Sequence, residues 1–174
     1  MSNLFERAEK IKLLSCDVDG VMTDGTLLFT SEGQEIKPFN ILDGQGIKML
    51  QNSGVKIAII TGRKSPMVEQ RAKNLGIDIL YQGREDKINA IKDIAKDLNL
   101  ELDQIAHIGD DLPDLPVIRN VGLGVTVPNG ADIIKEHAHH CTTKAGGKGA
   151  VRELCELIMK AQGTLAAAHA EYLK

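Results

Sequence analysis

Three short apolar runs, each followed at once by polar residues, constrain the fold of this chain more than any other feature. The runs span residues 11–16, 55–60 and 104–108. Such runs are typical of strands in a parallel sheet, where both faces of each strand are buried. Helical patterns between them give a βαβα rhythm. The sequence therefore predicts an α/β fold: a three-layer, Rossmann-like, mostly parallel sheet with helices on both faces.

The segments between these runs predict the remaining elements of one domain over residues 1–174. We expect helices at 46–51, 65–74, 86–98 and 115–119, strands at 77–81 and 122–127, and a C-terminal helical tail at about 149–174 with a break at Gly163. Ser65 is the expected N-cap of its helix, Pro66 stands at the first helical position, and Gly76 ends the helix. Two β-type runs around the turn at 31–34 predict a hairpin insertion over about 26–39.

Composition excludes several classes of partner. The chain has 21 Lys and Arg against 24 Asp and Glu, and only 3% aromatic residues without Trp, so it has neither a basic field nor stacking groups for nucleic acid. No run approaches the roughly 18 apolar residues that a membrane helix requires. Cys16, Cys141 and Cys155 are odd in number and widely spaced, which argues against a disulfide framework. We expect a cytoplasmic protein without nucleic-acid or membrane partners.

Polar clusters at the ends of the three runs predict a metal-assisted phosphoryl-transfer site. The clusters are Asp17-Val18-Asp19-Gly20, Thr61-Gly62-Arg63 and Gly109-Asp110-Asp111-x-x-Asp114, joined by Lys87 at the start of a helix. The carboxyl ends of parallel strands share one edge of the sheet, where ligands bind in open α/β folds. Asp17 and Asp19 can share a centre only if the chain turns after the strand, which Gly20 permits. Hard oxygen ligands favour Mg²⁺.

Each of these residues also has a simpler structural interpretation. A single Asp at a strand end more often caps a turn, and a single lysine such as Lys87 is more often a solvated helix charge. Only the combination of clusters, in this order and at these strand ends, favours catalysis.

The clusters resemble the four motifs of the haloacid dehalogenase superfamily of phosphohydrolases, across residues 11–127. The resemblance implies that Asp17 is the nucleophile that forms an aspartyl-phosphate. It implies that Asp19 protonates the leaving oxygen and then activates water. By the same resemblance, Thr61 binds the phosphoryl oxygens and Lys87 neutralises charge in the transition state.

The resemblance also implies a metal site. Asp110 is expected to join Asp17 and the backbone carbonyl of Asp19 on Mg²⁺. Asp111 and Asp114 are expected to support that site.

No long insertion follows the hairpin, so the chain resembles the capless, tetrameric branch of the superfamily. Within it, the segments 17–25, 43–47 and 145–153 are similar to the 3-deoxy-D-manno-octulosonate 8-phosphate phosphatase family, which serves lipopolysaccharide biosynthesis. That family implies a homotetramer whose hairpins form a central barrel, and a glycine-rich segment that approaches an active site. The chain departs from the family pattern at Leu42, where an arginine often precedes Asp-Gly.

Substrate recognition is expected from basic residues near the strand ends. Arg63 and Arg71 lie eight residues apart, about two helical turns, and suit a fork for a sugar-acid carboxylate or phosphate. The family resemblance assigns substrate binding to both, and we add Gly62 and Lys148. Arg63 directly after Thr-Gly favours an eight-carbon acid phosphate. For Arg71 a solvated helix charge is an equal alternative.

Three alternatives for the whole chain stay open at this point. A related phosphatase would act on nine-carbon, sialic-type acid phosphates. A noncatalytic tetramerisation module would not need every catalytic group, and a phospho-acceptor domain would have no use for Asp19.

Two other motifs give only weak evidence for a binding site. A nucleotide-binding P-loop requires Ser or Thr after its lysine, but Gly149 follows Lys148. The segment 137–141 contains histidines and a cysteine but lacks the ligand spacing of a zinc site.

Overall fold

The computed structural model describes residues 4–174 and contains a six-stranded parallel sheet with strand order β5-β4-β1-β6-β7-β8. The strands are β1 (Leu13–Cys16), β4 (Lys56–Thr61), β5 (Ile79–Gln82), β6 (Ile105–Ile108), β7 (Leu123–Thr126) and β8 (His140–Cys141), and β2 (Leu28–Phe29) and β3 (Glu35–Ile36) form a separate hairpin. The helices are α1 (Leu4–Glu9), α2 (Ile41–Asn52), α3 (Pro66–Leu75), α4 (Lys87–Leu98), α5 (Leu115–Ile118), α6 (Asp132–His137), α7 (Ala150–Ala161) and α8 (Leu165–Ala170).

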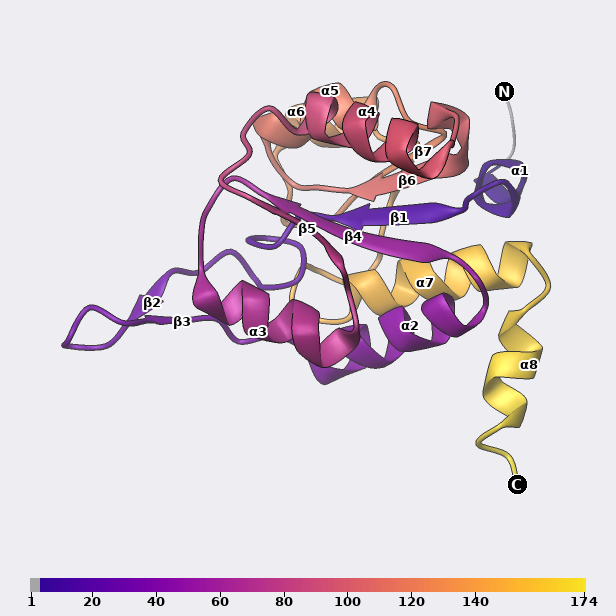
Figure 1. Cartoon of the computed structure of the whole chain (residues 1–174), viewed down its shortest axis with the longest axis horizontal. Helices are drawn as coiled ribbons and strands as arrows, with labels where there is room; N and C mark the ends of the chain where they lie inside the picture. Colours follow the sequence, from indigo (N-terminus) through magenta and orange to yellow (C-terminus); the bar gives the residue numbers. More distant parts are fainter. Residues whose placement is uncertain (1–3) are drawn as a thin grey trace.

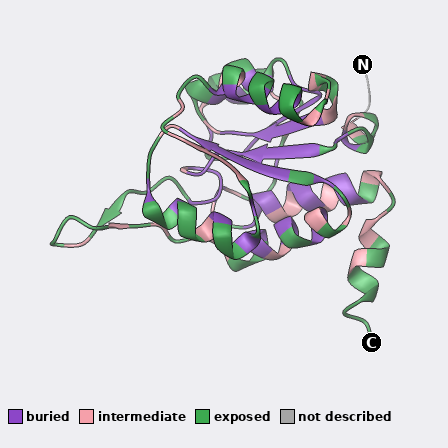
Figure 2. Ribbon diagram, in the orientation of Figure 1, coloured by how far each residue is buried: buried purple, intermediate pink, exposed green. Residues whose placement is uncertain are grey.

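The sheet lies between two helical layers, which confirms the predicted three-layer α/β fold. Helices α4, α5 and α6 cover one face, and α2, α3 and α7 cover the other (Figure 1). The four central strands, β1, β4, β6 and β7, are almost entirely buried (Figure 2). Each face has its own apolar core, since Leu14 and Ile59 belong to one cluster while Leu13 and Ile60 belong to the other. Successive side chains of a strand point to opposite faces, which accounts for this division.

Local signals placed α3 correctly and missed the start of α2. Ser65 caps α3 by accepting a hydrogen bond from Met67 N, and Gly76 ends the helix at φ +67°. Helix α2 begins at Ile41, several residues before the predicted 46, because the side chain of Asn40 caps Leu42 N at 2.8 Å. Helices α1 and α6 were not predicted. Each has only six residues, too few to establish a helical period.

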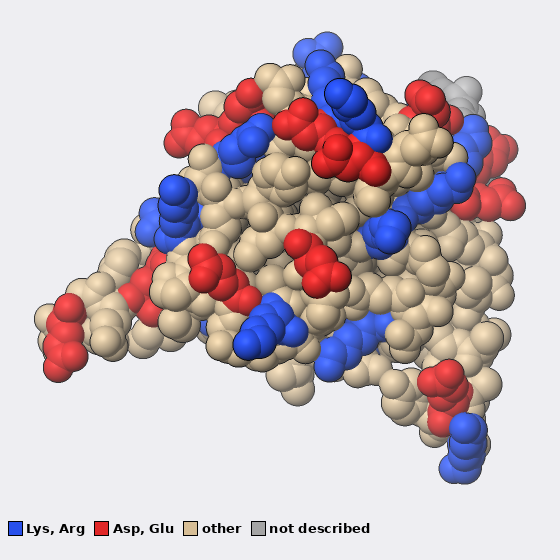
Figure 3. Space-filling model, in the orientation of Figure 1, with Lys and Arg blue, Asp and Glu red and all other residues tan. Residues whose placement is uncertain are grey.

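The hairpin between β1 and α2 is present but has little sheet structure. Its two strands contribute two residues each, with Leu28 paired to Ile36 and Phe29 to Glu35. The hairpin projects from the body of the protein, with a mostly uncharged surface and one acidic group at its tip (Figures 1 and 3). In residues 4–174 no cap domain accompanies it.

The segments 43–47 and 145–153 pack against each other beneath the sheet. Asp43 Oδ1 accepts a hydrogen bond from Arg152 N at 2.9 Å, and a Cβ on Gly46 would lie 2.7 Å from Arg152 Cδ. After α7 the chain turns at Gly163, at φ +71°, into the peripheral helix α8. Among the described helices, none is both long and apolar enough to cross a membrane.

Candidate active site

The chain order of the sheet places the predicted polar clusters together. Strands β1 and β6 are neighbours, but the chain continues from β1 to β4 toward one edge of the sheet and from β6 to β7 toward the other. This arrangement opens a crevice beyond the strand ends. Asp17 N continues the β1 ladder by donating to Ile108 O at 3.0 Å. Thr61 is the last residue of the neighbouring strand β4, and Asp110 follows the other neighbour, β6. The predicted edge is therefore formed by residues far apart in the sequence.

Lys87 lies between two carboxylates. Its Nζ is 2.8 Å from Asp17 Oδ1 and 2.6 Å from Asp114 Oδ1, and its side chain is only 3% exposed. Burial lowers the pKa of Lys87, but the two carboxylates outweigh this effect and raise it above the usual value. The ammonium is therefore charged where it faces Asp17. We call Asp17, Lys87, Asp110 and Asp114 the strand-end cluster.

Both carboxylate oxygens of Asp114 are occupied by donors from this chain. Oδ1 accepts from Lys87 Nζ and from His107 Nε2 at 2.9 Å. Oδ2 accepts from the backbone amides of Asp110 and Asp111, at 3.1 and 3.3 Å. Burial would raise the pKa of Asp114, but the contacts with His107 and Lys87 lower it to about 2. Asp114 is thus an ionised group that holds its neighbours in place, as expected for a supporting carboxylate.

Asp17 and Asp110 are the carboxylates that suit a cation. Oxygen atoms of Asp17, Asp110 and Asp114 lie within 4.8 Å of one another. Burial, followed by the charge of Asp114, raises the pKa of Asp17 to about 7 and that of Asp110 to about 6. A bound cation stabilises the anionic form of carboxylates whose pKa values are raised, as those of buried Asp17 and half-buried Asp110 are. The ligand atoms here are oxygens, because the nearby nitrogens of Lys87 and His107 donate hydrogen bonds to Asp114. Oxygen ligands favour Mg²⁺, so the residues present fit this ion.

A glycine is required where the chain turns over Asp110. Gly20 has φ +93°, and a Cβ at this position would lie 1.9 Å from Asp110 Oδ2. Both the predicted turn after β1 and the close approach it allows are therefore present.

Asp19 lies in a second group of charges, of which the sequence predicted Asp19 and Arg63 as site residues but not Glu35 and Lys37. Lys37, at the base of the hairpin, places Nζ 2.5 Å from Asp19 Oδ1 and 3.1 Å from Glu35 Oε1. Arg63 lies 3.3 Å from Glu35 and 4.0 Å from Asp19. The side chain of Lys37 is 3% exposed, as buried as that of Lys87. No local sequence signal marks Lys37, because its partner Asp19 lies on another segment.

Three further predicted site residues, Thr61, Gly62 and Asp111, lie at or just beyond the carboxyl ends of β4 and β6. Thr61 is buried at the end of β4, and its Oγ1 accepts a hydrogen bond from Arg63 N at 3.4 Å. Gly62 follows it and is half-buried. Asp111 is exposed and caps the next turn through Leu112 N at 2.8 Å.

The two remaining predicted substrate residues contact other parts of the chain. Arg71 donates from Nη2 to Asn40 O at 3.0 Å, and its guanidinium lies over the ring of Phe39, just before α2. Its Nε is buried without a hydrogen-bond partner. Lys148 is exposed, and its charge acts on Asp24 in the turn after β1. Their role in substrate binding stays a prediction.

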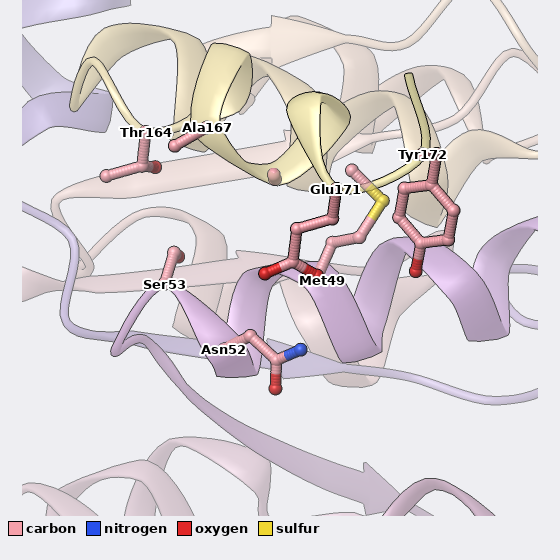
Figure 4. Close-up of a pocket in the computed structure, with 8 residues that line it drawn as sticks. Met49, Asn52, Ser53, Thr164, Ala167, Glu171 and Tyr172 are labelled. Carbon is pink, nitrogen blue, oxygen red and sulfur yellow. The ribbon is translucent and has the colours of Figure 1, made fainter. Parts of the chain in front are cut away.

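A separate hollow of about 280 Å³ lies between α2 and α8, and Figure 4 shows its lining. Glu171 and the phenol of Tyr172 lie beside Met49 there, and the lining contains neither lysine nor arginine. A phosphate ester would find no counter-charge in this hollow. The strand-end cluster is therefore the better candidate for chemistry.

Comparison with known proteins agrees with this geometry. Residues 16–84 and 80–154 match the family of haloacid dehalogenase-like hydrolases. The 3-deoxy-D-manno-octulosonate 8-phosphate phosphatase KdsC of Yersinia pestis is 47% identical over 94% of this chain and 87% of its own length. A crystal structure of a probable YrbI family phosphatase from Pseudomonas syringae has a TM-score of 0.97 at 58% identity, covering 98% of this chain and 97% of that one.

A further solved structure carries ligands. The 3-deoxy-D-manno-octulosonate 8-phosphate phosphatase of Moraxella catarrhalis, in complex with a magnesium ion, a phosphate ion and a KDO molecule, has a TM-score of 0.96 at 48% identity and covers 97% of both chains. The fold and the strand-end carboxylates thus define a haloacid dehalogenase-like hydrolase. Within that class, the chain belongs to the 3-deoxy-D-manno-octulosonate 8-phosphate phosphatase family.

Proposed function

We propose that this protein hydrolyses 3-deoxy-D-manno-octulosonate 8-phosphate to 3-deoxy-D-manno-octulosonate and phosphate, a step of lipopolysaccharide biosynthesis. The observation that carries the proposal is the buried carboxylate of Asp17, held 2.8 Å from Lys87 and beside Asp110 at the strand ends. The relatives named for this activity support the choice of substrate.

Asp17 and Asp110, with the backbone carbonyl of Asp19, would hold the Mg²⁺ ion. When bound, the ion neutralises charge on the phosphoryl oxygens and keeps both carboxylates ionised. Asp114 is left out of this set because its oxygens already accept four hydrogen bonds from Lys87, His107 and two backbone amides.

The reaction divides into two displacements at phosphorus. In the first, a carboxylate oxygen of Asp17 bonds to phosphorus, the bond from phosphorus to the sugar oxygen breaks, and Asp19 gives its proton to that oxygen. In the second, Asp19 takes a proton from water, whose oxygen bonds to phosphorus and releases Asp17. Lys87 faces the nucleophile throughout and offsets the negative charge that gathers on the phosphoryl group. Thr61 binds a phosphoryl oxygen.

Lys37 has a place in this scheme through Asp19. Its 2.5 Å contact fixes Asp19 Oδ1 on the hairpin side of the site. A proton donor must lie within hydrogen-bond reach of the leaving oxygen, so its orientation decides the rate. Lys37 therefore positions the acid rather than reacting itself.

Arg63 is the residue that we expect to bind the carboxylate of the sugar acid. Its side chain is 48% exposed beside Asp19, so its guanidinium can exchange Glu35 for a substrate carboxylate. Arg71, Gly62 and Lys148 complete the proposed substrate set. A nine-carbon acid phosphate is the nearest competitor for the same site.

The hairpin is the proposed assembly element of a cytoplasmic homotetramer. Leu27, Leu28, Phe29 and Ile36 are 41–57% exposed on it. Exposed apolar side chains gathered on one short element mark a protein interface more often than a free surface. A second copy of the chain, bringing the same residues, suits such a surface.

Phosphate release with Mg²⁺ tests the proposal. The substrates are 3-deoxy-D-manno-octulosonate 8-phosphate, a nine-carbon analogue and an aryl phosphate, with Asp17→Asn as the blank. We expect strong preference for the eight-carbon ester and at least about a thousandfold loss in the variant. Turnover of the other esters alone would overturn the substrate. Absence of any turnover would favour a noncatalytic module.

A further inference from the structure

Two buried polar residues lie behind Lys87 and have no part in the reaction above. Ser15 and His107 are both 0% exposed, and they face each other in the register of β1 and β6. Polar groups at the centre of a sheet lower stability unless they are hydrogen-bonded, and an apolar pair would pack there without that demand. Their partners therefore indicate what they do.

The two residues form a continuous chain of hydrogen bonds to Lys87. Ser15 Oγ lies 2.6 Å from His107 Nδ1, and His107 Nε2 lies 2.9 Å from Asp114 Oδ1. The same Oδ1 accepts from Lys87 Nζ at 2.6 Å. A carboxylate only accepts, so Nε2 carries a hydrogen, and the hydroxyl of Ser15 occupies the other ring nitrogen. The imidazole is held at both ends and cannot turn away from Asp114.

This arrangement fixes the direction of Asp114. Its Oδ2 is tied to the amides of Asp110 and Asp111, and its Oδ1 is tied to His107. Lys87 then has a defined place between Asp114 and Asp17. If His107 could not donate, Oδ1 would keep Lys87 as its one remaining side-chain donor, and the ammonium would be free to shift along Asp17.

We propose that His107, oriented by Ser15, is a positioning residue that holds Lys87 in its reactive place through Asp114. The role rests on the proposed function, because it matters only if Lys87 stabilises a phosphoryl-transfer transition state. An interaction of that kind affects kcat more than KM, because it strengthens as charge develops on the phosphoryl group.

Kinetics of two substitutions at one position test the proposal. His107→Phe keeps a ring of similar size but cannot donate, and we expect kcat to fall about tenfold with little change in KM. In His107→Gln the side-chain amide reaches Asp114 from nearly the same place, and we expect most of kcat to return. Ser15→Ala should have a smaller effect in the same direction.

Gln162→Ala supplies the matched control. Gln162 donates to Ile11 O at 2.7 Å at the opposite end of the sheet, so its loss lowers stability without touching the site. We expect its kcat to equal that of the unmodified protein. If His107→Phe also keeps its kcat, or if His107→Gln loses as much as His107→Phe, the positioning role is wrong.

Nitrogen NMR of the unmodified protein gives a second readout that does not require turnover. We expect a slowly exchanging Nε2–H signal from His107 and an observable Lys87 ammonium signal, with the ammonium signal lost in His107→Phe. If the protein hydrolyses no ester but shows these signals, the proposed function fails while the positioning of Lys87 stands. If the ammonium signal is unchanged in His107→Phe, the positioning role is overturned whatever the activity.

Discussion

The strand-end cluster buries charged side chains, whereas the hairpin exposes apolar ones. In the cluster, the charged groups of Asp17, Lys87 and Asp114 are buried, and each faces an opposite charge from the same chain. On the hairpin, apolar side chains such as Phe29, 57% exposed, face outward. A buried charge destabilises the fold unless an opposite charge or a hydrogen bond compensates it, and a large exposed apolar patch usually marks an interface. One chain completes the first region, whereas the second offers a surface that another chain would cover.

Lys37 connects the two regions. It lies at the base of the hairpin and contacts Asp19, which follows β1. The proposed reaction therefore depends, through Asp19, on the base of the hairpin where the chain returns from β3, but not on the apolar residues farther along the hairpin. Separate substitutions in the cluster, at this connection and on the hairpin can test that division.

Lys87→Met should have the largest effect. It leaves the carboxylates of Asp17 and Asp114 buried without their shared cation, so we expect at least about a hundredfold loss of kcat and about 3–5 kcal/mol of stability at pH 8. The stability loss should be smaller at pH 5, because Asp17, with a pKa of about 7, is protonated there. Phosphate release and urea unfolding at both pH values measure this.

Lys96→Met is the control for that substitution, since Lys96 lies exposed on the same helix. It should leave kcat and stability unchanged. Equal destabilisation of Lys87→Met at the two pH values would contradict the assignment of Asp17 as the titrating partner.

The pH dependence of the metal-free protein should follow Asp17 and Asp110. Their pKa values, about 7 and about 6, exceed the ordinary value of 3.8, so the folded state binds more protons than the unfolded state between these limits. Stability from these groups is present below pH 4 and falls as pH rises toward 7. Asp114, with a pKa of about 2, contributes a slope of the opposite sign, but only below about pH 5, where the unfolded carboxyl begins to bind a proton.

Magnesium should reverse that loss. At a free concentration about 100 times Kd, binding adds about 2.7 kcal/mol, and the gain should be larger at pH 8 than at pH 5 because protons compete for the carboxylates. Thermal unfolding with and without Mg²⁺ measures the difference. A gain independent of pH would place the ion away from Asp17 and Asp110.

Lys37→Met should reduce kcat about tenfold through loss of the contact that orients Asp19. Assembly should be preserved, because the side chain of Lys37 is buried rather than part of the exposed apolar surface. Lys56→Met, at the exposed start of β4, is the control. Normal kcat combined with loss of assembly would mean that Lys37 serves the hairpin alone.

The sequence predicted the parts of this comparison that depend on local pattern. Apolar strands followed at once by carboxylates predicted that Asp17 and Asp110 lie together, and the structure places Lys87 beside them, while their catalytic roles stay a prediction. A glycine turn likewise predicted the hairpin. Lys37 and His107 were missed because their partners lie on other segments. From the sequence alone, Lys37 resembles an ordinary surface charge and His107 an ordinary core residue of an apolar strand. Their contacts with Asp19 and Asp114 are visible only in the folded structure.

Phe29→Asp should have the smallest effect on the chemistry and acts only on the hairpin half of the comparison. A carboxylate on the exposed apolar surface opposes its burial against another chain, so sedimentation velocity should show species smaller than the tetramer. Turnover of an aryl phosphate should stay within about twofold, since substitutions at exposed positions away from a site change free energies by no more than about 0.5 kcal/mol. Ile133→Asp, an exposed apolar position on α6, should change neither property. If aryl phosphate turnover fell together with assembly, the strand-end cluster would need a neighbouring chain, and the contrast between a self-sufficient site and a shared surface would fail.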